Sequence, residues 1–211
     1  GTVYDKSQRV AALASSIAQQ MGSEAQLAER AALLAKCDLV TEMVGEFPEL
    51  QGIMGRYYAQ LDDEPADVAE ALDEQYRPRF AGYELPQTAT GIAVSLAEKL
   101  DTIVGLFGIG QIPTGSKDPF ALRRASLGVL RLLVEKEINI DLGDLIDWAI
   151  GSDWATAPKA ETKATLTEYL LDRFSAWYAD EGIPAGVFQS VRALGITNAL
   201  DINRRVQAVH R

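Results

Sequence analysis

Apolar residues recur along most of this chain at intervals of three and four, the spacing that places them on one face of an α-helix. The longest stripe covers residues 93–107, and another follows after a loop rich in glycine and proline. The sequence shows neither the alternation of a half-buried strand nor an internal repeat. The pattern predicts an all-α fold, with helices over residues 10–21, 24–36, 40–47, 50–58, 68–72, 93–107, 122–133, 138–151 and 166–177 and two short helices after them.

The apolar stripes that predict helices become shorter after about residue 138. A polar stretch rich in Ala, Thr and Lys at residues 152–164 is the best candidate for a subdomain boundary. From this change we predict a helical domain over residues 1–140 and a helical connector over residues 141–211.

The charge of the chain limits what it binds. Its 211 residues carry a formal net charge of −10, which argues against a general binder of polyanions, because non-specific affinity for nucleic acid comes from neutralising phosphates. Any contact with nucleic acid must therefore be local. No apolar run approaches the roughly 20 residues that a membrane-spanning helix needs.

The single cysteine and the single histidine of the chain limit which disulfides and metal sites it can form. Cys37 is the one cysteine of the chain, which excludes an internal disulfide framework and fits a reducing cytoplasm. His210 is the one histidine and lies next to the last residue, so no internal site with several histidines can form. The chain begins at Gly1 without a methionine, and we expect it to be a piece of a longer protein.

The run over residues 111–124 combines features that favour binding of an anion. Asp118 followed by Pro119 predicts a helix N-cap with proline at the first helical position. The preceding loop can then turn backbone N–H groups toward a ligand at the positive end of the helix. The run also supplies three cations suited to phosphate: Lys117, Arg123 and Arg124. The alternative is an ordinary capped helix whose arginines pair with neighbouring carboxylates.

A second basic set lies at residues 74–82. Arg77 and Arg79 flank a proline, so both can project from an extended loop, with Tyr76 and Phe80 available to stack on single-stranded RNA. The alternative is a loop whose aromatic residues anchor it to the helices. Its arginines would then pair with carboxylates such as Glu74 or Glu84.

Three stretches, residues 6–11, 33–38 and 96–101, resemble the metal-binding pattern of the HD-superfamily helical hydrolases. The positions of the metal ligands in that pattern are held here by Lys6, Cys37, Asp38 and Glu98. A lysine in place of a neutral donor does not suit a metal, so we expect a degenerate site without metal. We expect its carboxylates to pair with Lys6, Lys36 or Lys99 and Cys37 to be buried and inert.

Several longer blocks occur in the order and spacing of one family. Residues 36–44, 49–55, 76–82, 96–102 and 111–124 resemble consecutive blocks of the bacterial glycyl-tRNA synthetase beta subunit. The likeness extends from residue 1 to about residue 137 and is weaker afterwards. One departure is Glu98, which stands where the family typically has an aspartate.

This resemblance implies a fragment made of an HD-like helical domain and a connector toward a C-terminal anticodon-binding region. It implies a non-catalytic role in a cytoplasmic α2β2 glycine–tRNA ligase, with tRNA-Gly and the alpha subunit as partners and neither DNA nor a membrane. ATP and Mg²⁺ would act on the alpha subunit, and the fragment would hold no cofactor. The basic residues that would contact tRNA are Lys117, Arg123, Arg124, Arg77, Arg79 and Lys99.

Two alternatives stay open at this stage. One is a residual metal-dependent HD phosphohydrolase acting on nucleotides, with Asp38 and Glu98 as ligands. The other is a purely structural connector that never contacts RNA.

Overall fold

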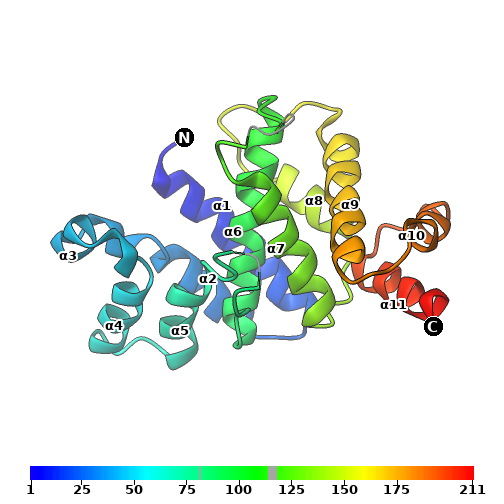
Figure 1. Ribbon diagram of the computed structural model, residues 1–211. Coiled ribbons are helices and arrows are strands. Elements are labelled where there is room, and N and C mark those ends of the chain that lie inside the picture. Colours follow the sequence, from blue (N-terminus) through cyan, green and yellow to red (C-terminus); the bar gives the residue numbers. More distant parts are fainter. Residues whose placement is uncertain (81, 114–117) are drawn as a thin grey trace. The chain divides into compact units, whose positions relative to one another are not determined.

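The protein is described by a computed structural model that covers residues 1–80, 82–113 and 118–211. All regular elements of these residues are helices, which confirms the all-α prediction (Figure 1). The chain forms two compact units. Unit 1 comprises Gly1–Thr102 and Ser152–Ala155, and unit 2 comprises Ile103–Gly151 and Thr156–Arg211.

Unit 1 is built on paired helices of the N-terminal half. In chain order its elements are α1 (Val3–Gln20), α2 (Ala25–Leu34), the 3₁₀ turn η1 (Cys37–Val40), α3 (Glu42–Glu46), the 3₁₀ turn η2 (Pro48–Leu50), α4 (Ile53–Leu61), α5 (Ala66–Glu74) and the part of α6 (Ala89–Gly108) up to Thr102. Helix α2 packs on α1 and on α5, and α5 packs on α4. The core contains small and branched side chains, such as Ala14, Ile17 and Leu96, which are fully buried.

Unit 2 collects the C-terminal helices around the last residues of α6. Its further elements are α7 (Leu122–Glu135), α8 (Leu142–Ile150), α9 (Thr162–Asp180), α10 (Ala185–Arg192) and α11 (Ala199–His210). Helix α9 packs on α7, α8 and α10, and α11 packs on α7 and α10. The core includes the stacked rings of Phe174 and Tyr178, whose centroids lie 5.2 Å apart.

Helix ends follow local rules that the sequence displays. Thr2 caps α1 in a capping box, because its Oγ1 accepts from the Asp5 amide at 3.1 Å and its own amide donates to Asp5 Oδ2 at 2.6 Å. At the other end Gly22, with φ +71°, terminates the helix where the sequence predicts a stop. Asn198 caps α11 in the same way as Thr2, accepting from the Asp201 amide at 2.9 Å.

The boundary between the two compact units does not lie near residue 140, where the sequence predicts a domain boundary. The compact units separate at Thr102 and Ile103, within α6, and Ser152–Ala155 belongs to unit 1. The physical reason is that α7 packs on α9 and α11. A helix that the sequence groups with the N-terminal domain therefore shares its core with the C-terminal helices.

The helix predicted over residues 40–47 is the least accurate of the set. The structure has a 3₁₀ turn followed by the five-residue α3. Only Val44 of the apolar stripe is buried, whereas Val40 is 90% exposed and Phe47 is 50% exposed. The apolar periodicity is thus real but faces outward. In the described residues, no helix is both long and apolar enough to cross a membrane.

Gly91 offers a test of the packing of unit 1. It lies in the first turn of α6 beside the buried carboxylate of Glu74, which accepts from the Gln87 amide at 2.6 Å and from the Thr88 hydroxyl at 2.5 Å. A methyl group at Gly91 would meet Glu74 Cβ at 2.8 Å. We therefore expect Gly91→Ala to lower the free energy of unfolding by about 1–3 kcal/mol, measured by urea denaturation.

The matched control is Gly186→Ala, in the first turn of α10. A Cβ at this position has no neighbouring atom of the described residues within 4 Å, so the substitution should leave stability unchanged or raise it by up to about 1 kcal/mol. Equal unfolding midpoints for the two variants would contradict the close contact at Gly91.

Candidate functional site

The centre of the predicted degenerate metal site is filled by a lysine. The Lys6 ammonium lies 3.1 Å from Glu98 Oε1 and 3.1 Å from Asp101 Oδ2, and it donates to Thr102 Oγ1 at 2.8 Å. Both carboxylates stand on α6, and Lys6 reaches them from the first turns of α1. A positive charge thus lies between the carboxylates, in the role that a bound cation would have.

Two more cations complete this ion-pair network. Arg9 forms two hydrogen bonds to the Asp101 carboxylate, at 2.7 and 3.2 Å, and its guanidinium lies 4.1 Å from the centre of the Trp154 ring. Lys36 lies 3.5 Å from Glu98 Oε1. Burial favours a raised pKa for Glu98, but the charges of Lys36 and Lys6 outweigh it, and the pKa is lowered. The predicted pairing of Glu98 with Lys6 and Lys36 is confirmed.

The other two predicted ligand positions do not join Glu98. Asp38 is buried and accepts from the Gly52 amide at 2.7 Å, so its carboxylate secures the start of α4. Cys37 is an exposed free thiol, and the prediction that it is buried is wrong, because η1 turns its side chain outward. Across the described residues, no group of three or more His, Cys, Asp or Glu is placed to hold a metal ion.

Lys99, predicted to contact RNA, lies in the interior of unit 1. Its ammonium donates to Ser95 Oγ at 2.7 Å and to the carbonyl oxygen of Arg77 at 2.7 Å, and the residue is 8% exposed. Burial lowers the pKa of Lys99 to about 7. This side chain holds the segment after α5 against α6 and offers no exposed charge to a phosphate.

The loop after α5 holds its arginines against carboxylates. Arg77 lies 2.5 Å from Asp73 Oδ2 and 3.0 Å from Glu84 Oε1, as the alternative interpretation of this loop predicts. Arg79 donates to the Gln51 carbonyl at 3.1 Å and to Asp73 at 3.2 Å.

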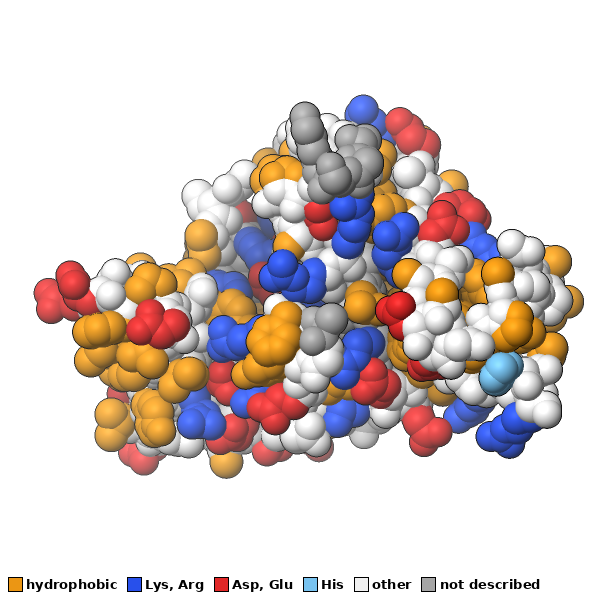
Figure 2. Space-filling view, viewed as in Figure 1, with side chains coloured by type: hydrophobic (Ala, Val, Ile, Leu, Met, Phe, Trp, Pro, Cys, Tyr) orange, Lys and Arg blue, Asp and Glu red, His pale blue; other side chains and the backbone are white. Residues whose placement is uncertain are grey.

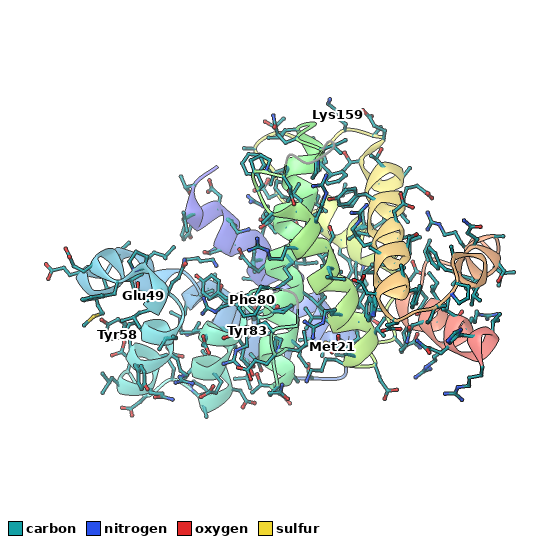
Figure 3. All side chains as sticks on the ribbon, viewed as in Figure 1. Met21, Glu49, Tyr58, Phe80, Tyr83 and Lys159 are labelled. Atoms are coloured by element: carbon teal, nitrogen blue, oxygen red, sulfur yellow. The ribbon has the colours of Figure 1, made fainter. Side chains whose placement is uncertain are left out.

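The aromatic residues of this loop have different surroundings. The Tyr76 ring lies beneath the Lys36 ammonium, 4.4 Å from it, and beneath the Arg79 guanidinium, 5.2 Å from it. Phe80 is 57% exposed and meets the edge of Tyr83, with the ring centroids 4.7 Å apart (Figure 3). Of the two aromatic residues predicted to stack on RNA, Tyr76 and Phe80, it is therefore Phe80 whose exposed ring can contact a base.

The start of α7 differs from the prediction in a way that matters for anion binding. The helix begins at Leu122 and not at Pro119, because Ala121 has a left-handed backbone with φ +54°. The carboxylate of Asp118 accepts from the amides of Leu122, at 2.8 Å, and Arg123, at 3.0 Å. An internal carboxylate thus occupies the helix N-terminus, so these two N–H groups are not available to a phosphate. Lys117 lies outside the described residues.

The side chains of α7 provide a basic surface instead. A groove of about 280 Å³ lies between α7 and α9, and three arginines line it together with the indole of Trp177. We call this the arginine groove; its members are Arg123 and Arg131 from α7, and Arg173 and Trp177 from α9. Figure 2 shows Lys and Arg side chains on the face where α7 and α9 lie side by side.

The members of the groove are held by defined contacts. Arg131 forms a two-point ion pair with Glu135, at 2.6 and 3.2 Å. Arg173 lies over the ring of Tyr169, 4.9 Å from its centre, and its buried Nε has no hydrogen-bond partner among the described residues. Trp177 is half-buried and donates from Nε1 to Glu181 at 2.6 Å.

Of the residues predicted from the run at 111–124, the structure brings Arg123 into the groove, whereas Arg124 is exposed beside it on α7. Arg131 and Arg173 are not among the residues predicted from the sequence. The sequence does carry a signal for them: residues 123, 127 and 131 follow one face of a helix at intervals of four, and residues 173, 176 and 180 follow one face of α9 at intervals of three and four. Only the packing of α7 on α9 places the two faces together.

Fold and site together define, over the described residues, an all-helical module with three arginines lining one groove and an ion-pair network around Lys6. Residues 1–193 match the sequence profile of the family described as "Glycyl-tRNA synthetase beta subunit". The chain belongs to this family.

Individual relatives agree with this assignment. The chain is 58% identical over 209 residues to the glycine–tRNA ligase beta subunit of Pseudomonas putida strain W619, and 57% identical over 209 residues to that of Ectopseudomonas mendocina. The beta subunit of Pseudomonas syringae pv. syringae is 55% identical over the same length. These alignments cover 99% of this chain and 31% of each relative. The chain therefore spans about a third of the length of these curated relatives.

The low pKa of Lys99 predicts how stability depends on pH. Between about pH 7 and the ordinary lysine value of 10.5 the unfolded chain binds a proton at Lys99 that the folded chain has released. The contribution of Lys99 to the free energy of unfolding therefore rises with pH across this window. Its total size is on the order of a few kcal/mol.

The measurement compares the wild type with Lys99→Met at several pH values from 6.5 to about 10 by denaturant unfolding. We expect the difference in stability to shift in favour of the wild type as the pH rises. A difference that stays constant with pH would show that Lys99 has its ordinary pKa in the folded state.

Proposed function

We propose that this chain is a tRNA-positioning part of the beta subunit of a glycine–tRNA ligase, and that the arginine groove holds phosphates of tRNA-Gly. ATP-dependent activation of glycine, with its Mg²⁺, would take place on the alpha subunit. The proposal rests on family membership together with one observation: three guanidinium groups from two helices converge on one groove in a chain whose net charge is −10.

The groove suits this task chemically. A guanidinium is always charged and forms paired hydrogen bonds to phosphate oxygens, which fixes the position of the phosphate as well as its charge. Arg173 lies on Tyr169 and Arg131 is held by Glu135, so both side chains lose little freedom when a phosphate binds. The half-buried indole of Trp177 adds an apolar wall for a sugar or a base.

Positioning is itself a contribution to the reaction. Transfer of the glycyl group requires the terminal ribose of the tRNA to meet the activated amino acid in a defined geometry, and holding two reactants in place lowers the barrier substantially. A negative module with a local basic groove can hold one anionic ligand without attracting every polyanion. The cytoplasm is the compartment in which we place this function, and the free thiol of Cys37 is consistent with it.

The other basic residues predicted to contact tRNA differ in the role that this proposal gives them. Arg124 is exposed on α7 and is a second contact beside the groove. Arg77 and Arg79 are engaged by Asp73 in unit 1, so we propose them only as secondary contacts. Lys99 is left out because it is buried. A metal-dependent phosphohydrolase is not favoured, because the Lys6 ammonium occupies the position between Glu98 and Asp101.

The test uses the complete α2β2 enzyme with Arg123→Ala and Arg173→Ala combined in the beta subunit. Each lost charge-assisted hydrogen bond costs about 1.5–3 kcal/mol, so we expect the KM for tRNA to rise at least about tenfold. The slope of log affinity against log salt should fall by about 0.7–0.9 for each phosphate contact removed. Glycine-dependent exchange of pyrophosphate into ATP should stay unchanged, because it does not require tRNA.

Arg205→Ala is the matched control. Arg205 is exposed on α11 of the same unit and pairs with Asp201 on its own helix, so its loss should leave the KM for tRNA unchanged. If the groove variant binds tRNA with unchanged affinity and an unchanged salt slope, the structural-connector alternative stands and the proposal is wrong.

A further inference from the structure

A second cleft, of opposite charge, lies in unit 1. It has a volume of about 300 Å³ and is lined by residues of α2, η1, α4 and the turn before α5. Its polar lining consists of Arg30, Cys37, Asp38, Thr41, Tyr58, Asp62 and Glu64. We call it the acidic cleft. Tyr58, labelled in Figure 3, lines it from α4.

The charges of this cleft are unbalanced. Arg30 is the single cation among the described residues that line it, and Arg30 is already engaged in an ion pair with Glu64. Asp62 is exposed and Asp38 is 3% exposed, and both are acidic. The cleft therefore presents a negative potential that repels phosphate and attracts a cation.

Asp38 also has an unused acceptor. One of its carboxylate oxygens accepts from the Gly52 amide, whereas the other, Oδ1, is buried without a hydrogen-bond partner among the described residues. Buried polar atoms are nearly always hydrogen-bonded in native proteins, so an unpartnered carboxylate oxygen in the wall of a cleft indicates a missing donor. An ammonium or guanidinium group supplies both the donor and the compensating charge.

The surroundings of the cleft are apolar. Val40, next to the lining residue Thr41, is 90% exposed, and Leu61, next to the lining residue Asp62, is 79% exposed. Three more large side chains of α3, its C-terminal end and α4 are 41–50% exposed: Met43, Phe47 and Tyr57. Figure 2 shows these hydrophobic side chains gathered over α3 and α4. Exposed apolar side chains concentrated in this way are typical of a surface that another polypeptide covers.

We propose that the acidic cleft and its apolar surroundings dock a polypeptide segment of the same beta subunit from outside residues 1–211, with an arginine or lysine that enters the cleft toward Asp38 and apolar neighbours that cover Val40 and Leu61. The relatives support this source, because the chain covers only 31% of their length. The remaining part of such a subunit is ample to supply the segment. The proposal rests on family membership and is independent of the arginine groove.

Cys37 provides a direct reporter of the occupied cleft. It lines the cleft, its thiol is exposed in residues 1–211, and its alkylation can be followed by mass mapping of the peptide that contains it. In the full-length beta subunit we expect Cys37 to react with N-ethylmaleimide at least about tenfold more slowly than in the variant Val40→Asp with Leu61→Asp, because the two new charges displace the segment. Val40 and Leu61 are so exposed that the variant should keep its helical circular dichroism.

The matched control is Val209→Asp, since Val209 is 58% exposed on α11 of unit 2. This variant should leave the protection of Cys37 unchanged. Rapid alkylation of Cys37 in the wild-type full-length subunit would show an open cleft and overturn the proposal. Protection that appears only after the alpha subunit is added would also overturn it, because the occupant would then belong to the other subunit.

A photoreactive benzoylphenylalanine at position 61 of the full-length subunit identifies the occupant. A crosslink to a segment outside residues 1–211 that contains an arginine or lysine between apolar residues supports the proposal. A crosslink to a second beta subunit or to bound tRNA, or to a segment without a basic residue, contradicts it.

Discussion

The structure of unit 1 depends on how it compensates a lysine that is largely enclosed between helices. Lys6 brings an ammonium against α6, and a charge in the interior is costly unless it is paired and hydrogen-bonded. Glu98 and Asp101 supply the pairing, Thr102 supplies a neutral acceptor, and Arg9 balances the second carboxylate. The network ties α1 to α6. Removal of one of its charged members would break an ion pair and leave the partner's charge uncompensated. The network includes Lys6 and Glu98, two of the four positions at which the sequence resembles the HD-type pattern, and it holds an ammonium between two carboxylates.

The candidate site for an anion lies on the surface of unit 2. The basic run at residues 111–124 first suggested an anion site at a helix N-terminus, but Asp118 fills that position with an internal carboxylate. The useful cations are therefore the side chains on the flank of the helix. Arg123 meets Arg173 in the groove only because α7 packs on α9. A phosphate held there would be bound by side chains from two helices, which fixes its position better than one helix end would.

The sequence predicts the long helices well, because stripes such as residues 93–107 can be buried only on one face of a helix. It also indicates the pairing of Glu98 with Lys6 and Lys36, since the aligned blocks place these residues together. It cannot predict the start of α7, which depends on the left-handed backbone of Ala121, a non-glycine residue that carries no turn signal. Nor can it show that Lys99 is buried, or that Arg173 joins Arg123, because both depend on which helices pack together.

The two proposed binding surfaces would also exclude each other's ligands. The acidic cleft of unit 1 sets three carboxylates against one arginine that is already paired, so a phosphate chain gains nothing there. The arginine groove of unit 2 sets three guanidinium groups against Glu135 and Asp180, so a basic polypeptide is repelled from it. Specificity of this kind needs repulsion as well as attraction. On these two proposals, a chain with a net charge of −10 would bind RNA and polypeptide on different units without relying on the shape of either ligand.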